Sequence, residues 1–481
     1  MQESFELSAD EMRKFGYAIV DSIIDHRTNI RHKKVSNQKR HEELLPHLGE
    51  DIPLEGTDPL ELLAHLNKYV FSQIMHTDHP RFYSFIPAPS NFIGVMADTL
   101  AAGYNVFAGH WLASSAAGEI EMMCVDWLRK LYDFPDSASG IFVSGGSMAN
   151  LMAVATARKM KLGREDAKGI IYYSKQTHSS VAKGLRVLGF GAQDMRPIET
   201  DDQLRLDLHA LKKQLKQDLE AGLTPFCLIA NAGTTNAGAI DPLAELAEIA
   251  ATYNLWLHVD GAYGAAAVIT DMGKKMLRGI ELADSITLDP HKWWFQPFEI
   301  GCLLVRHRVH LQKTFSVTAE YLEDTKNDRE QEITYYEHGI QLTRSFRALK
   351  FYMSLKIYGL NLFKAAILKG IEMAEYVEQQ ISKKQNFRII TSAQLGILNF
   401  QYAPEGIGEE QINQLSKKIA EKIMDDGYSL TLTTKIRDKT VLRMCPIHPE
   451  LEKREIDQSI QQIETFGQEA LQEIEHQQTT S

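Results

Sequence analysis

Residues 255–263 read LWLHVDGAY, a short apolar run that ends in the carboxylate of Asp260. A run of this length, followed by a glycine, is typical of a buried β-strand. Similar runs recur along the chain, and helical patterns such as Met148–Lys161 and Pro242–Tyr253 lie between several of them. This alternation predicts an α/β fold with a mostly parallel central sheet and helices on both faces. The strand candidates are Gly140–Val143, Gly169–Tyr173, Phe226–Ala230, Leu255–Val259, Ser285–Leu288 and Gly301–Val305.

The composition is that of an ordinary globular protein. The chain has 481 residues, of which 44% are hydrophobic and 24% charged, so we expect a sizeable buried core. A formal net charge of −11 argues against a nucleic-acid partner, because there is no excess of Lys and Arg to displace counterions. The N-terminus does not resemble a signal peptide, and no apolar run approaches the length of a membrane span. With four scattered cysteines and no CxxC pair, we expect a soluble cytoplasmic protein without a metal site.

Three segments are predicted along the chain. Residues 1–84 form a helical segment that begins with a Ser-x-x-Glu capping box and has too few helices to enclose a core. We therefore expect it to pack on a partner subunit or on the main body. Residues 85–359 form a large α/β domain, whose last helix is expected to end at Gly359. Residues 360–481 form a small α+β domain. Its strand candidates are Gly396–Phe400 and Thr440–Met444.

Four features fall at or just past predicted strand ends, where ligands of parallel sheets bind. The glycine turn Ser144–Asn150 offers backbone N–H groups and a helix N-terminus to an anion. His178 lies just past one strand, Asp260 ends another, and Lys292 follows a third. Taken singly, these features also fit an ordinary turn, a structural histidine, a capping aspartate and a lysine whose stem packs on tryptophan.

Together, the four features match what pyridoxal 5′-phosphate requires. This cofactor needs a lysine for covalent attachment, an acidic partner for its pyridine nitrogen and a seat for its phosphate. Lys292 would be the attached lysine, which the amine of an amino acid substrate displaces. Asp260 would keep the ring nitrogen protonated, and His178 would supply a flat ring. The sequence therefore predicts a pyridoxal-phosphate site.

The motifs at these positions are similar to those of one family of enzymes. Across nearly its whole length, the chain resembles the pyridoxal-phosphate-dependent group II amino acid decarboxylases, most of all the aromatic-L-amino-acid decarboxylases. The matching motifs are His79–Phe82, Glu119–Glu121, Ser144–Ser147, His178–Ser180, Gly233–Thr235, His258–Asp260, His291–Trp293 and Arg344–Lys350. The resemblance implies a fold-type-I homodimer with shared active sites, in which residues 1–84 wrap over the partner as a dimerisation segment. It also implies that an aromatic L-amino acid is converted to its amine and carbon dioxide.

Individual roles follow from the same resemblance. Lys292 is implied as the attached lysine, Asp260 as the partner of the pyridine nitrogen and His178 as the residue stacked on the ring. The further cofactor-binding residues that it implies are Gly146, Ser147, Met148, Thr235, Ala262 and His291. Asp289 stands where the animal enzymes have an asparagine beside the phosphate.

The family's proton donor is a tyrosine, for which Tyr335 and Tyr336 are the two candidates. Counting back from the Phe346-Arg347 motif without a gap favours Tyr335, whereas a one-residue gap selects Tyr336. A tyrosine here is typical of amine-producing decarboxylases, and related aldehyde synthases often have phenylalanine. The densely charged segment 320–332 is expected to be a surface loop that closes over the site.

The substrate pocket is implied by positions that match the family's lining. These positions are Phe85, Ile86, Pro87 and Phe107. An apolar and partly aromatic lining suits phenylalanine, tyrosine, tryptophan or dihydroxyphenylalanine better than an acidic substrate. A decarboxylase of acidic or diamino acids and an oxidative aromatic aldehyde synthase remain alternatives on the same scaffold. A nucleotide-dependent dehydrogenase lacks its GxGxxG fingerprint here, and a non-catalytic homologue would not need all the implied catalytic residues.

Overall fold

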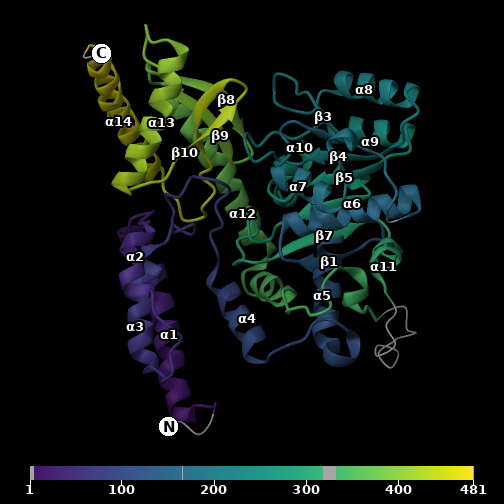
Figure 1. The fold of residues 1–481 in the computed structure, drawn as a ribbon, viewed down its shortest axis with the longest axis horizontal. Coiled ribbons are helices and arrows are strands. Elements are labelled where there is room, and N and C mark those ends of the chain that lie inside the picture. Colours follow the sequence, from purple (N-terminus) through teal and green to yellow (C-terminus); the bar gives the residue numbers. More distant parts are fainter. Residues whose placement is uncertain (1–4, 165, 318–331, 480–481) are drawn as a thin grey trace.

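A seven-stranded sheet forms the centre of the computed structural model, which describes residues 5–164, 166–317 and 332–479 (Figure 1). The strand order is β1-β7-β6-β5-β4-β2-β3, and β7 is the strand that runs antiparallel to its two neighbours. The other pairs, β2–β3, β2–β4, β4–β5 and β5–β6, are parallel. The predicted α/β class is confirmed. The strands are β1 Ser139–Val143, β2 Ile170–Ser174, β3 Met195–Ile198, β4 Pro225–Asn231, β5 Trp256–Asp260, β6 Ser285–Leu288 and β7 Gly301–Val305.

Both faces of this sheet are covered. Along β4, Leu228 and Ala230 belong to one apolar cluster, whereas Cys227 and Ile229 belong to another. Because successive residues of a strand point to opposite faces, each face packs its own core. The surrounding helices are α4 Phe92–Gly103, α5 Trp111–Leu131, α6 Gly146–Leu162, α7 Ser179–Val187, α8 Leu208–Glu220, α9 Leu243–Thr252, α10 Asp271–Met276 and α11 Val309–Phe315.

The N-terminal helices form an arm beside the main body (Figure 1). Helix α1 (Ala9–Asn29) begins with the predicted capping box, in which Ser8 Oγ accepts the Glu11 N–H at 3.3 Å and Glu11 Oε2 accepts the Ser8 N–H at 2.9 Å. Helices α2 (His41–Leu48) and α3 (Pro59–Tyr69) complete the arm. These three helices contain no buried residue in the single chain. The apolar side chains of these helices are therefore left at least partly exposed by the rest of the described chain.

The last part of the chain builds a second sheet. Its four antiparallel strands lie in the order β10-β11-β9-β8. Helix α12 spans Ala348–Ser382, and the predicted end at Gly359 is a sharp kink with φ 73° and ψ 153°, after which the helix resumes. The helix continues because residues beyond the kink pack into the cores of both sheets. The other elements are β8 Phe387–Gln394, β9 Ile397–Tyr402, α13 Glu409–Asp426, β10 Leu432–Ile436, β11 Lys439–Met444 and α14 Lys453–Thr479.

Candidate active site

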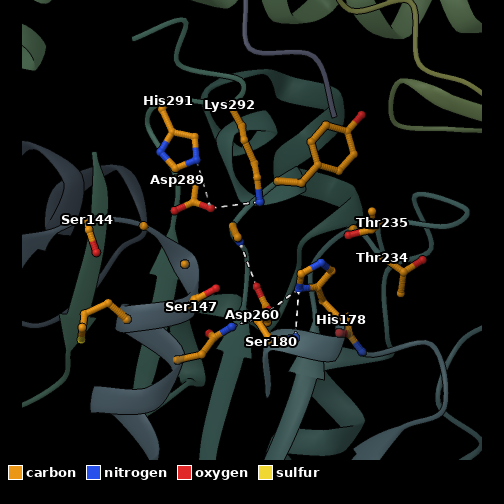
Figure 2. Close-up of a pocket in the computed structure, with 18 of the residues that line it drawn as sticks. Ser144, Ser147, His178, Ser180, Thr234, Thr235, Asp260, Asp289, His291 and Lys292 are labelled. Atoms are coloured by element: carbon orange, nitrogen blue, oxygen red, sulfur yellow. Dashed lines mark hydrogen bonds and ion pairs between the residues drawn. The ribbon is translucent and has the colours of Figure 1, made fainter. Parts of the chain in front are cut away.

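A cavity of about 350 Å³ opens at the carboxyl ends of the central strands (Figure 2). The structure brings to its wall every cofactor-binding residue that the sequence predicted. These residues are Gly146, Ser147, Met148, His178, Thr235, Asp260, Ala262, His291 and Lys292. They come from segments far apart in the chain. They meet because the strands that precede them, β1, β2, β4, β5 and β6, all run in the same direction and end at one edge of the sheet.

The glycine turn forms an open cradle at one side of the cavity. Strand β1 ends at Val143 and helix α6 begins at Gly146, so the positive end of the helix dipole faces the cavity. A Cβ atom on Gly146 would lie 2.9 Å from Asp289 Oδ2 and 3.1 Å from the Cβ of Ala262. A side chain at this position would fill the cradle. The glycine thus leaves room for an anion at the helix N-terminus.

Asp260 is held at the end of β5 by a chain of buried hydrogen bonds. Its Oδ2 accepts a hydrogen bond from Asn150 Nδ2 at 2.9 Å, and its Oδ1 accepts the Ala262 N–H at 3.2 Å. Behind Asn150, the Oδ1 atom lies 2.9 Å from His258 Nε2, and His258 Nδ1 lies 2.8 Å from Ser285 Oγ. The carboxylate is therefore fixed in direction before any ligand arrives.

The protonation state of His258 follows from this chain. Because an amide Oδ1 only accepts, His258 Nε2 must carry the proton and Nδ1 must accept from the Ser285 hydroxyl. The same hydroxyl oxygen accepts the Trp256 Nε1–H at 2.9 Å. Burial lowers the pKa of His258 to about 4, although the charge of Asp260 opposes that shift. A neutral His258 orients Asn150 and adds no charge of its own behind Asp260.

His178 stands at the start of α7, on the exposed side of the cavity. Its Nδ1 lies 2.8 Å from Ser180 Oγ and accepts the Ser180 N–H at 3.3 Å, so the ring caps the helix. The helix cap and the predicted role are compatible, because a ring fixed through one nitrogen still presents its face to the cavity. Figure 2 shows His178 and Asp260 on one side of the cavity, and Lys292 on the other.

Lys292 forms an ion pair inside the cavity. Its Nζ lies 2.9 Å from Asp289 Oδ2, and the same oxygen is 3.6 Å from His291 Nε2. Burial acts to lower the pKa of Lys292, but the charge and hydrogen bond of Asp289 outweigh it, so the pKa is raised. Lys292 is thus an ammonium group in this arrangement, and it must lose a proton before it can act as a nucleophile.

Several residues of the wall were given no individual role from the sequence. Ser180, Thr234 and Tyr263 belong to motifs quoted above, whereas Asn231 and Glu299 were not singled out. Asn231 ends β4 as Asp260 ends β5, so its position at a strand end was an available signal. Glu299 lies in the irregular segment between β6 and β7, for which no periodicity gives a position.

The two tyrosine candidates lie outside this wall. Tyr335 is 1% exposed and packs in an apolar cluster with Ile141 and Met152. The guanidinium carbon of Arg344 lies 4.8 Å from the centre of its ring, and its hydroxyl has no hydrogen-bond partner among the described residues. Tyr336 is also buried, and its N–H donates to the Gly109 carbonyl at 2.9 Å. Most of the predicted closing loop, 320–332, lies outside the described residues.

The predicted substrate positions are also outside the first cavity. Phe85 is 59% exposed, Ile86 is partly buried and Pro87 is buried. Phe107 lines a neighbouring cavity of about 640 Å³, and Glu299 is the residue that lines both cavities. The single chain therefore brings together the residues predicted to bind the cofactor but not those predicted to bind the substrate.

The cavity has the three parts that pyridoxal phosphate requires: an anion cradle that a Cβ on Gly146 would fill, a fixed carboxylate at Asp260 and a lysine across from it. Gly146 and Ser147 would hold the phosphate, Asp260 the ring nitrogen, and Lys292 the carbonyl carbon. Fold and site thus define an enzyme of the pyridoxal-phosphate-dependent class.

The comparisons with known proteins identify the family within this class. Residues 42–403 match the pyridoxal-dependent decarboxylase conserved domain, and the chain belongs to this family. Among its relatives is an aromatic-L-amino-acid decarboxylase of Bacillus atrophaeus, which is 46% identical over 98% of both chains. A phenylacetaldehyde synthase of Arabidopsis thaliana is 30% identical over 94% of this chain and 95% of its own. The structure of Catharanthus roseus tryptophan decarboxylase in complex with L-tryptophan matches with a TM-score of 0.90 and 26% identity, over 97% of this chain and all of that one.

Proposed function

We propose that this enzyme removes the α-carboxylate of aromatic L-amino acids and releases the corresponding amine and carbon dioxide. The observation that carries the proposal is the placement of Lys292 and Asp260 on facing sides of one cavity, in a chain that resembles an aromatic-L-amino-acid decarboxylase over its full length. The bound cofactor accepts the electron pair that is released when a bond at Cα breaks.

Each residue of the wall has a distinct part in the proposed reaction. Lys292 Nζ would lose its proton and hold the cofactor until the substrate amine takes its place. Asp260 would keep a proton on the ring nitrogen. His178 would contact the ring from the exposed side, and the cradle at Gly146 and Ser147 would hold the phosphate and so orient the ring. This orientation decides which bond at Cα is weakened.

An acidic substrate is disfavoured by the charges of the site. Among the described residues that line the first cavity, Lys292 is the only lysine or arginine. The neighbouring cavity holds Arg344, Arg347 and Lys350, but these pair with Glu121 at 2.6 Å, Glu299 at 2.9 Å and Asp98 at 2.6 Å. A second carboxylate on the substrate would thus find no uncommitted cation in either wall.

A competition assay tests the proposal. The enzyme receives pyridoxal phosphate and an equimolar mixture of the protein amino acids and dihydroxyphenylalanine, and amines, aldehydes and hydrogen peroxide are quantified. We expect aromatic amines as the main products. Main products derived from glutamate, aspartate or a diamino acid would contradict the proposal. Aldehyde with hydrogen peroxide, in place of amine, would identify an oxidative aldehyde synthase, the activity that the name of the Arabidopsis thaliana relative indicates.

We propose Tyr335 as the residue that returns a proton to Cα after carbon dioxide leaves. In the described arrangement its hydroxyl is buried away from the cavity, so the segment Tyr335–His338 must rearrange, or serve the site of a partner subunit. Tyr335→Phe should lower amine formation at least about tenfold and raise the aldehyde-to-amine ratio, because general acid catalysis is lost. Since this hydroxyl has no partner in the described fold, the variant should keep its melting temperature. Tyr336→Phe is the matched control, and an effect confined to it would transfer the role to Tyr336.

We also propose a homodimer with shared active sites, in which residues 1–84 form the dimerisation segment beside the domains 85–359 and 360–481. The support is the arm itself, whose exposed apolar side chains include Met12, Tyr17 and Leu45. Burying such side chains between two copies is favourable. A partner could also bring Phe85 and Phe107 toward the substrate. Sedimentation velocity distinguishes the dimer from a monomer.

Location in the cytoplasm is a further part of the proposal. The support is chemical, since Cys124, Cys227, Cys302 and Cys445 are all buried free thiols, as is usual in a reducing compartment. In the part of the chain that the structure describes, no helix has the length and apolar character needed to cross a membrane.

A further inference from the structure

Asp289 is a buried carboxylate at the anion cradle with an incomplete set of partners. It is 4% exposed, and its Oδ1 has no hydrogen-bond partner among the described residues. Its Oδ2 contacts Lys292 Nζ at 2.9 Å. A Cβ on Gly146 would lie 2.9 Å from Oδ2, and one on Gly145 would lie 3.8 Å from Oδ1. Both oxygens therefore face the turn where a phosphate would bind.

The charges of the cavity do not balance once a phosphate enters. Asp260 has Asn150 and, in the loaded enzyme, the protonated ring nitrogen, whereas Glu299 is paired with Arg347. Among the described residues, Lys292 is the only charged group that neutralises Asp289. A phosphate dianion in the cradle would place two anions beside that single ammonium group. Two anions that share one ammonium group in a buried site repel each other strongly. We therefore expect the site to take up a proton when the phosphate enters.

His291 provides a place for that proton. Its Nδ1 lies 2.7 Å from the Ile300 carbonyl oxygen and 3.3 Å from the Ile300 nitrogen. Because the carbonyl oxygen is the closer atom and can only accept, Nδ1 carries the hydrogen, and Nε2 is left facing Asp289 at 3.6 Å. Burial lowers the pKa of His291, although the charge of Asp289 opposes this, so the imidazole is neutral in the present arrangement. A proton on Nε2 would turn the contact with Asp289 into an ion pair.

We propose that Asp289 and His291 together take up one proton when the phosphate of the cofactor enters the cradle, so that Asp289 makes cofactor loading pH-dependent. The titratable groups that face this pair among the described residues are Lys292, Asp260, His178, Tyr263, Glu299, Lys350 and the Cys302 thiol. Of these, Lys292 stays charged through the neutral range because its pKa is raised, and burial raises the pKa of Cys302, which stays neutral. The inference rests on the family's cofactor and is independent of the substrate.

The test uses 4′-deoxypyridoxine 5′-phosphate, which has the ring and the phosphate but no aldehyde to react with Lys292. Binding to the apoenzyme is measured between about pH 7 and about pH 8, where the phosphate is a dianion and the ring nitrogen of the free probe already carries its proton. Because the wild type gains a proton on binding, its dissociation constant should rise with pH, by up to about tenfold per unit. Calorimetry in buffers of different ionisation enthalpy should report the uptake of about one proton.

Asp289→Asn is the decisive variant. Its amide carries no charge and can donate a hydrogen bond to the phosphate, so the pH dependence should fall below about twofold per unit, with binding at least about tenfold tighter than wild type at the alkaline end. Asp218→Asn, a buried aspartate that pairs with Arg196 at 3.0 Å away from the cavity, is the matched control and should behave as the wild type. An Asp289→Asn protein that keeps its melting temperature but shows the wild-type pH dependence, or weaker binding throughout, would overturn the proposal. Neither result depends on decarboxylation.

Discussion

Replacing Lys292 with alanine should abolish amine formation, with a loss on the order of 10³-fold or more, because the group that attaches the cofactor and exchanges it with the substrate amine is removed. The absorption band of the lysine–cofactor linkage should disappear as well. The cradle and Asp260 remain, so the variant should still bind the cofactor non-covalently. Absorption spectroscopy and a product assay with a saturating aromatic amino acid check these expectations.

Lys292→Ala also leaves Asp289 without its ammonium partner, so a control for the stability of the fold is needed. Lys350→Ala is the matched control, since Lys350 is a buried lysine that pairs with Asp98 at 2.6 Å outside the first cavity. Both variants should lose some stability, because each leaves a carboxylate without its partner. The spectrum of the linkage should change in Lys292→Ala alone. If Lys292→Ala retained both the band and the amine product, another amine would have to be the attachment point.

The sheet could be predicted because its strands are covered on both faces. Such strands appear in the sequence as continuous apolar runs, of which Phe226–Ala230 is an example. The edge strand β3, Met195–Ile198, was missed, since it contains Arg196 and Pro197 and exposes part of its surface. Strands β8 and β10 of the second sheet were missed for a similar reason, because most of their residues are only partly buried.

That the residues predicted to bind the cofactor line one cavity has a topological reason. Asp260, His178 and Lys292 each lie at or shortly after a strand end, and neighbouring parallel strands bring their carboxyl ends together. The hydrogen bond between His258 and Asn150 could not be predicted, since it joins residues 108 positions apart through side-chain packing.

The burial of Tyr335 is likewise a tertiary effect. It depends on an apolar cluster and on Arg344, whose guanidinium also donates to Glu121 at 2.6 Å and to the Phe142 carbonyl at 2.8 Å. A motif can suggest which tyrosine serves the reaction, but it does not give the position of that tyrosine in a given state of the chain. The predicted substrate positions have the same limit, because in the proposed shared site their placement depends on a second copy of the chain.

Asp260→Asn should lower the rate of amine formation by about 10²- to 10³-fold while leaving cofactor binding within about tenfold of the wild type. Asparagine keeps the shape of the side chain and can still accept from the Ala262 N–H, but it removes the charge that holds a proton on the ring nitrogen. Without that proton, the ring is a poorer acceptor of the electrons released at Cα. Steady-state kinetics should therefore show a fall in kcat with little change in KM.

Two comparisons separate this electrostatic role from a structural one. Asp284→Asn is the control, since Asp284 accepts the Leu257 N–H at 2.8 Å near the opposite end of β5, and its loss should affect stability but not kcat. A cofactor analogue methylated at the ring nitrogen carries a permanent positive charge and does not need Asp260 to retain it. This analogue should restore part of the activity of Asp260→Asn relative to the natural cofactor. If the analogue gave no recovery while the variant stayed folded, the charge of Asp260 would not be what drives the reaction, and its hydrogen bond with Asn150 would remain as the explanation.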